Sequence, residues 1–271
     1  YDDGWRGGVF FTDDNFIGNK RKLKEETLPA IIEWNRSRGY PFAFITEASI
    51  NLADDETLMQ MMVDAGFDMV FVGIESPNEE SLQECNKMPN KGRDMLAAVK
   101  TIQSRGLQVQ GGFIVGFDGD PPSIFQSQIN FIQRSGIVTA MVGVLMAPPG
   151  TPLYKRLQAE GRLLHGGTGN NTDGSTNILP KMGLQRLTEG YNNVVNTIYS
   201  PRHYYERVRV FLEQYRPHSN HRDDYSPRYI KALLKCMWTI GVRDRGRADF
   251  WRLYAWTLRH KPRCFHLFIT F

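Results

Sequence analysis

The chain has 271 residues, of which 41% are hydrophobic and 23% charged, so its composition excludes a disordered or fibrous protein. It contains no run of about 18 apolar residues, and no membrane-spanning helix is expected. Charge is divided unevenly: residues 201–271 carry 15 Lys and Arg against 6 Asp and Glu, whereas residues 1–200 carry 18 against 23. We interpret the basic tail as a solvated helical face, with an acidic partner or a membrane surface as the alternative.

A unit of amphipathic helix, glycine and apolar strand repeats through the first half of the chain. The glycines that are expected to end helices are Gly39, Gly66, Gly106 and Gly136. Apolar residues recur with helical spacing in Asp54–Ala65 and Arg93–Arg105. Continuous apolar runs, typical of a parallel sheet covered on both faces, predict strands at Gly8–Thr12, Phe42–Thr46, Met69–Ile74, Val109–Val115 and Val138–Met146. This order predicts β/α units with right-handed crossovers.

The pattern changes after Leu163. A loop rich in glycine and amides, His165–Asn177, is long enough to be functional. Helices are predicted beyond it at Leu184–Tyr199, Pro201–Tyr215, Pro227–Gly241 and Gly246–His260, several of them with proline at the start. We therefore predict an α/β domain over residues 1–152 and a helical domain over residues 153–271. No nucleic-acid-binding motif is found, and no nucleic-acid partner is expected.

The three cysteines, Cys85, Cys236 and Cys264, lie far apart and are odd in number. This argues against a disulfide framework and indicates a reducing compartment, so we expect a cytoplasmic protein, with peripheral membrane contact through the basic tail left open. The histidines are interpreted as surface residues without metal spacing, His218 and His221 excepted. We expect no metal ligands in this chain. Its start at Tyr1 and its end at Phe271 look like cuts in a longer protein.

Polar residues follow each predicted strand, where β/α barrels place their functional groups. Each group has a structural alternative: a helix cap, a turn, or a tight packing position. Acids at four successive strand ends would repel one another in one mouth, which favours a cationic or hydrogen-bond-donating ligand there. The segments are Asp13-Asp14-Asn15, Glu47-Ala48-Ser49, Glu75-Ser76-Pro77, Gly111–Asp118 and Ala147-Pro148-Pro149.

The chain resembles the radical S-adenosylmethionine (SAM) superfamily, and in particular its cobalamin-binding, hopanoid methylase-like branch with an uncharacterised helical carboxy-terminal domain. The segments that carry the resemblance, in this order, are Asp13–Phe16, Thr46–Ser49, Gly73–Ser76, Gly112–Gly116 and Ala147–Tyr154. The resemblance covers nearly the whole chain. It implies a partial (β/α)6 radical-SAM-type barrel, from the second to the sixth strand, followed by an α-helical carboxy-terminal region. Tyr1–Arg6 is then expected to end the first helix of the barrel.

The resemblance also implies roles in SAM binding. The first strand of this chain would be the second strand of the barrel, and the segment after it would bind the methionine amino group. The ends of the third and fourth barrel strands would bind the carboxylate and the ribose, and the ends of the fifth and sixth would contact the adenine. The family's usual closing Glu is displaced here by Asp118 or Gly119. In chain order the implied residues are Asp13, Asp14 and Asn15, then Glu47 and Ser49, then Glu75 and Ser76, then Gly112, Ile114 and Gly116, and finally Ala147 and Pro148.

The sequence lacks the family's CxxxCxxC loop, whose thiolates hold a [4Fe–4S] cluster. The cluster ligands and a cobalamin domain are therefore expected upstream, and this chain alone is expected to be inactive. For the intact protein the resemblance implies SAM cleavage at the cluster, an electron donor, methyl transfer from cobalamin and a small-molecule or lipid-like substrate. We expect the His165–Asn177 loop to exclude water from the mouth.

Two other interpretations remain open. Asp14, Glu47 and Glu75 could surround Mg²⁺ in a metal-dependent barrel lyase. Alternatively, the barrel could be a non-catalytic binding module that only docks a partner.

Overall fold

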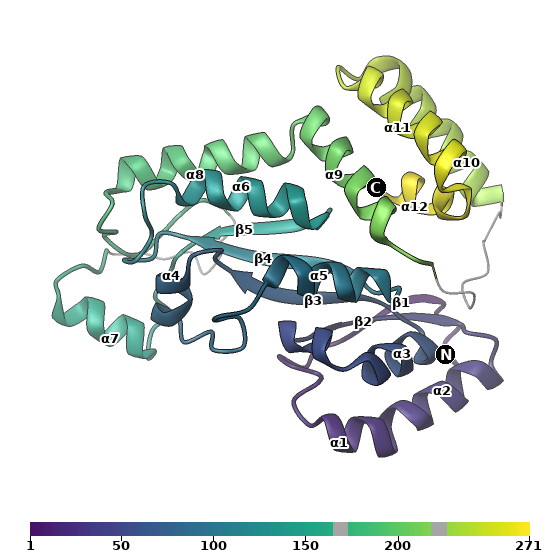
Figure 1. Cartoon of the computed structure of the whole chain (residues 1–271), viewed down its shortest axis with the longest axis horizontal. Coiled ribbons are helices and arrows are strands. Elements are labelled where there is room, and N and C mark those ends of the chain that lie inside the picture. Colours follow the sequence, from purple (N-terminus) through teal and green to yellow (C-terminus); the bar gives the residue numbers. More distant parts are fainter. Residues whose placement is uncertain (165–172, 218–226) are drawn as a thin grey trace.

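The computed structural model describes residues 1–164, 173–217 and 227–271. Within these ranges five strands form one parallel sheet in sequential order (Figure 1): β1 (Gly7–Phe11), β2 (Phe42–Glu47), β3 (Phe67–Glu75), β4 (Gln108–Val115) and β5 (Ala140–Val144). Every neighbouring pair is parallel, with register pairs such as Phe10↔Ile45 and Gly73↔Gly112. The predicted α/β partial barrel is confirmed, and its five predicted strands match the observed ones to within a few residues.

The crossovers between strands are helical. They are α1 (Lys20–Lys22), the π-helical turn η1 (Leu23–Thr27), α2 (Leu28–Ser37), the 3₁₀ turn η2 (Ile50–Asp54), α3 (Glu56–Ala65), α4 (Glu79–Glu84), α5 (Met95–Ser104) and α6 (Ile124–Ser135). The glycines expected to end helices all adopt left-handed φ, and Gly66 and Gly136 are helix C-caps. Tyr1–Arg6, expected to end a helix, forms a turn and extended chain instead.

The outer face of the sheet carries the main core. Val70, Val72 and Ile74 of β3 are fully buried there against the crossover helices, whereas the alternate residues of the same strand are half-buried. That alternation follows from the period of two along a strand. The alternate residues line the concave inner face, where Phe10 and Met141 are 49% and 47% exposed. One face of the sheet is thus a core and the other an open surface.

The helical region follows as α7 (Pro152–Ala159), α8 (Leu184–Ile198), α9 (Pro201–Gln214), α10 (Pro227–Trp238), the π-helical turn η3 (Thr239–Arg243), α11 (Arg247–His260), the 3₁₀ turn η4 (Pro262–Cys264) and α12 (Phe265–Thr270). Helix α8 packs into the core of the sheet through Leu187, Val194 and Ile198. The later helices lie in the upper right of Figure 1. They build a second core around Phe211, Phe250 and Phe268. None of the helices in the described ranges is both long and apolar enough to cross a membrane.

Candidate functional site

The strand ends that carry polar residues lie along one edge of the sheet. All pairings from β1 to β5 are parallel and in sequence, so the five carboxyl ends point the same way (Figure 1). Parallel sheets bind ligands at this edge. The placement that the sequence predicted for the strand ends, on one side of the molecule, is therefore confirmed.

A cavity of about 170 Å³ lies on the concave face, near the carboxyl ends of β3, β4 and β5. Glycines form much of its floor: Gly73 and Gly112 are register partners, and Gly143 is the partner of Ile114. A Cβ atom on Gly112 would lie 2.9 Å from Phe71 Cζ, so a larger residue at this position would have to displace the Phe71 ring. The full lining comprises Phe71, Gly73, Glu75, Gly112, Phe113, Ile114, Met141 and Gly143. Three of the residues singled out from the sequence, Glu75, Gly112 and Ile114, therefore meet here.

Glu75 closes this cavity in a strained backbone conformation. Its φ is +62°, which non-glycine residues rarely adopt and which occurs often at functional sites. The strand register shifts between Gly73 and Glu75. Two side chains hold the turn: Lys87 Nζ lies 2.8 Å from Glu75 Oε1, and the buried Asn90 amide donates to the carbonyls of Gly73 and Ile74, both at 3.0 Å. The turn thus aims the Glu75 side chain toward the concave face.

Ser76, the next predicted residue, is fully buried. Its Oγ accepts a hydrogen bond from the Asn78 backbone N–H at 3.2 Å, and its own N–H donates to Ile74 O. It does not line the cavity. In this structure Ser76 stabilises the turn after β3, which is the structural alternative that the sequence offered for this residue.

Hydrogen bonds between Asn15 and Ser49, which we call the Asn15–Ser49 bracket, join the ends of β1 and β2. Asn15 Oδ1 accepts hydrogen bonds from Ser49 N at 3.1 Å and Ser49 Oγ at 3.2 Å, and Phe16 N donates to Glu47 O at 3.0 Å. Asp13 and Asp14 are exposed beside this bracket, and Glu47 is half-exposed. The structure brings Asn15, Glu47 and Ser49 to one place, and Glu47 is the register partner of Phe71, which lines the cavity.

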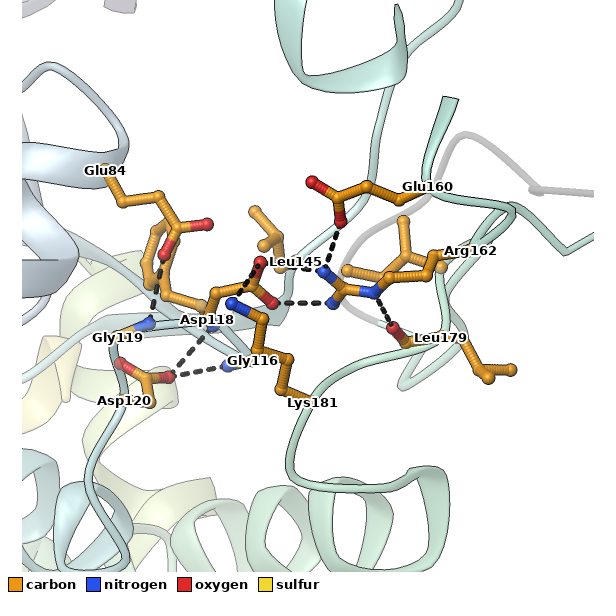
Figure 2. Close-up of polar contacts among 12 residues, drawn as sticks. Glu84, Gly116, Asp118, Gly119, Asp120, Leu145, Glu160, Arg162, Leu179 and Lys181 are labelled. Atoms are coloured by element: carbon orange, nitrogen blue, oxygen red, sulfur yellow. Dashed lines mark hydrogen bonds and ion pairs between the residues drawn. The ribbon is translucent and has the colours of Figure 1, made fainter. Parts of the chain in front are cut away.

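The end of β4 is organised by two aspartates with opposite environments (Figure 2). Asp120 Oδ2 accepts from Gly116 N and Phe117 N, and the Ser81 hydroxyl donates to Asp120 Oδ1 at 2.6 Å. Burial raises the pKa of Asp120. Gly116, at φ +107°, packs against Leu187 rather than the cavity, so its role here is to turn the chain.

Asp118 forms two hydrogen bonds with the Arg162 guanidinium, at 2.6 and 2.8 Å. Arg156 and Lys181 approach the same carboxylate at 3.5 and 3.6 Å. The Arg162 hydrogen bonds hold the pKa of Asp118 below its ordinary value. Figure 2 shows Arg162 between Asp118 and Glu160, with Leu179 O accepting from its Nε.

These pairs correct one step of the sequence argument. From the sequence, mutual repulsion among the strand-end acids favours a cationic or hydrogen-bond-donating ligand. Lys87 compensates Glu75, and three cations of the chain's own helical region surround Asp118. Glu75 and Asp118 therefore do not by themselves require a ligand, because the fold supplies the opposite charges to these two carboxylates.

The segment between α7 and α8 returns along the end of β5, and we call residues 160–164 and 173–181 the return segment. The Asn177 side chain accepts from Ala147 N and donates to Ala147 O, both at 2.8 Å, and Thr176 Oγ1 donates to Leu145 O at 2.6 Å. Ala147 is buried by these contacts, and Pro148 is exposed. Of the predicted His165–Asn177 loop, residues 165–172 lie outside the described ranges, so its water-excluding role stays a prediction.

Sequence reasoning missed Lys87, Asn90, Arg162 and Asn177, which hold the strand ends in place. Only weak signals existed for them, because each contacts its partner across an irregular segment. The lining residues Met141 and Gly143 could have been found, since they follow the inner-face alternation of β5.

No group of three His, Cys, Asp or Glu side chains suited to a metal ion occurs in the described part of the chain. Asp14, Glu47 and Glu75 therefore do not form the magnesium site of the lyase interpretation. His218 and His221 lie outside the described residues. Cys264 is buried in the second core, and the Cys85 thiol lies near Leu82 O, where burial raises its pKa.

Comparison with known proteins finds relatives that match nearly the whole chain. The chain is 38% identical to an uncharacterized methyltransferase of Synechocystis sp. over its whole length and 51% of the relative. It is 32% identical to the hopanoid C-2 methylase of Rhodopseudomonas palustris over 92% of the chain and 47% of that protein. The relatives of this chain are therefore methyltransferases, and a hopanoid C-2 methylase is among them. It spans about half the length of these curated relatives.

Two further comparisons concern the helical region and the fold. A domain of unknown function, DUF4070, matches residues 151–271. The fold resembles that of TsrM from Kitasatospora setae, a radical S-adenosylmethionine methyltransferase solved with cobalamin and a [4Fe–4S] cluster. The TM-score is 0.56 at 13% identity, over 91% of this chain and 52% of that one. At this identity the likeness shows the fold alone.

Proposed function

We propose that this chain forms the SAM-binding part of a cobalamin-dependent radical SAM methyltransferase. The observation that carries the proposal is the glycine-floored cavity at the carboxyl ends of β3, β4 and β5. It coincides with Glu75, Gly112 and Ile114, to which the family resemblance assigns ribose and adenine binding. The relatives' names, methyltransferase and hopanoid C-2 methylase, support the reaction class.

The residues present fit the nucleoside part of SAM. Ligand pockets usually enclose roughly 300–1,000 Å³, so a cavity of about 170 Å³ suits one moiety of a larger ligand. Its walls are the Phe71 ring, Ile114 and Met141, which offer an apolar slot for a planar base, and Glu75 stands at the rim as a hydrogen-bond acceptor for hydroxyls. The Asn15–Ser49 bracket and Glu47 provide further polar groups along the same edge for the methionine part.

The described residues do not fit a [4Fe–4S] cluster, because they bring no three cysteines together and the sequence contains no CxxxCxxC. The cluster, cobalamin and an electron donor belong, in this proposal, to other parts of the protein and its partners. SAM with its cluster would supply radical chemistry, and cobalamin a transferable methyl group. The chain's own residues bind and orient SAM. We extend the proposal to a lipid-like substrate on the strength of the hopanoid methylase relative.

Binding of SAM to the full-length, anaerobically reconstituted protein tests this assignment by equilibrium dialysis. Gly112→Ala places a methyl group against Phe71 and forces the ring into the slot, so we expect SAM affinity to fall about tenfold or more, equivalent to about 1.4 kcal/mol. Gly8→Ala is the matched control, because its Cβ on β1 meets nothing within 4 Å. Equal affinities in both variants, with unchanged thermal unfolding, would refute the placement.

A further inference from the structure

Helix α10 and turn η3 expose a continuous apolar stripe. Ile230, Leu234 and Trp238 recur every four residues, and they are 51%, 62% and 60% exposed. Val242, one further step along η3, is 48% exposed. Residues four apart lie on one helix face, so these side chains form a row rather than scattered surface residues. The neighbouring Cys236 and Met237 pack against the second core, which fixes the orientation of the helix.

The stripe continues onto α11. The Trp251 indole N–H donates to Gly241 O at 2.8 Å, which holds the ring beside Val242, and Trp251 is 36% exposed. Single exposed apolar residues are normal on a soluble protein, but a contiguous row that includes two tryptophans marks an interaction surface. Tryptophan is enriched where proteins meet the interface between lipid and water.

The charges around this stripe are mainly basic. Residues 227–251, which span the stripe, contain six Lys and Arg and two acids. The Asp244 carboxylate accepts a hydrogen bond from Gly246 N, and Asp249 pairs with Arg252. Lys231 and Lys235 are exposed on α10 next to the stripe, and Arg243 is exposed at the end of η3. Each Lys or Arg near an anionic bilayer contributes about 1 kcal/mol of attraction. An apolar row flanked by lysines is the pattern of a helix that lies in the membrane interface.

This face lies at the far end of the barrel from the cavity. Helices α9 to α12 attach where the strands begin: the Tyr215 hydroxyl donates to Gly106 O just before β4, and Val138, just before β5, belongs to their core. Figure 1 shows α10 and α11 beyond α9, away from the strand ends near α4 and α7. Occupation of the stripe therefore leaves the cavity open.

We propose that α10 and η3 bind the surface of an anionic lipid bilayer, with the stripe inserted at the headgroup level and the basic side chains against lipid phosphates. The charge complementarity selects this occupant over the other two that an exposed apolar row admits, a further segment of the longer protein and a second copy of the chain. The proposal does not depend on the methyltransferase assignment.

Co-sedimentation of the full-length protein with phosphatidylcholine vesicles, with and without phosphatidylglycerol, tests it. We expect binding to the anionic vesicles that weakens as salt is raised. Leu234→Glu, and separately the pair Lys231→Glu and Lys235→Glu, should each weaken it at least tenfold. The matched control is Met88→Glu, because Met88 is 59% exposed but lies outside the stripe, and its binding should be unchanged.

Three results would overturn the proposal. The first is no preference for anionic vesicles, or equal binding by Leu234→Glu and the unaltered protein. The second is concentration-dependent self-association that Leu234→Glu abolishes, which would assign the stripe to a second copy. The third is hydrogen exchange at α10 that is slow without vesicles and unchanged by them, which would show that the rest of the protein covers the stripe.

Discussion

The ion pair between Asp118 and Arg162 should decide how firmly the return segment is held against the end of β4. The pair spans 44 residues of sequence and is nearly enclosed, since the Asp118 and Arg162 side chains are 9% and 15% exposed. The Asp118→Asn substitution keeps the size and one acceptor oxygen, but it removes the negative charge that faces three cations. It therefore tests the charge rather than the shape.

The magnitude follows from the two bonds. Hydrogen bonds to charged groups contribute about 1.5–3 kcal/mol each, and breaking a buried pair on one side costs about 3–5 kcal/mol. Asparagine retains one acceptor, and Arg162 keeps its bonds to Glu160 and Leu179 O. We therefore expect the free energy of unfolding to fall by about 3 kcal/mol. Glu160→Gln removes a pair whose acid is 39% exposed, so we expect less than about 1 kcal/mol.

Urea unfolding followed by circular dichroism measures both variants, and amide exchange of Leu179, whose N–H donates to Arg162 O, reports the return segment locally. The folded-state pKa of Asp118 is lowered, so its contribution is complete above the unfolded value of about 3.9 and disappears as pH falls below it. Asp118→Asn should accordingly flatten the acid limb of the stability curve. Equal losses in the two variants, or a loss below about 1 kcal/mol at Asp118, would refute the reasoning.

Three further predictions concern the same scaffold. Asn90→Ala leaves two strand-end carbonyls without their donor, so urea unfolding should show a loss of about 2–3 kcal/mol; a loss below about 0.5 kcal/mol would contradict this role. Arg207→Met removes a fully buried guanidinium that donates to three acceptors, one each in α6, α8 and the segment before β5. Calorimetry should show a loss of about 2–4 kcal/mol in the free energy of unfolding, and an unchanged stability would contradict this role. Asp120 has a raised folded-state pKa, so the free energy of unfolding should fall as pH rises from the unfolded value of about 3.9 through the folded-state pKa. Asp120→Asn should remove this fall, and an unchanged slope of stability against pH would contradict the prediction.

The sheet could be predicted from the sequence because its rules are local. Val70, Val72 and Ile74 alternate with inner-face residues, and a glycine such as Gly66 or Gly136 ends the preceding helix. Both patterns extend over only a few residues, so the strand positions, the parallel pairing and the common edge of the strand ends could be predicted from them. Gly112 and Ile114 reached the cavity for the same reason.

The partners of the strand-end acids could not be predicted, because they depend on irregular segments that bring distant residues together. Lys87 reaches Glu75 across 12 residues, and Arg162 reaches Asp118 across 44. No periodicity specifies such contacts, and the repulsion argument failed where these cations were overlooked. Helix α8 is a similar case: its apolar face was visible in the sequence, but not that the sheet's own core would bury it.

The carboxy-terminal region, matched as one domain of unknown function, acts at both ends of the barrel. Its first part supplies Arg162 and Asn177 to the strand ends that border the cavity, whereas its last helices attach at the strand beginnings through Tyr215 and carry the apolar stripe on the far side. If both proposals hold, membrane binding and SAM binding should be separable by mutation. Leu234→Glu should release the protein from vesicles without changing SAM affinity, and Gly112→Ala should do the reverse. A variant of either kind that changed both properties would show that the two ends communicate through the sheet, which the contacts described here do not require.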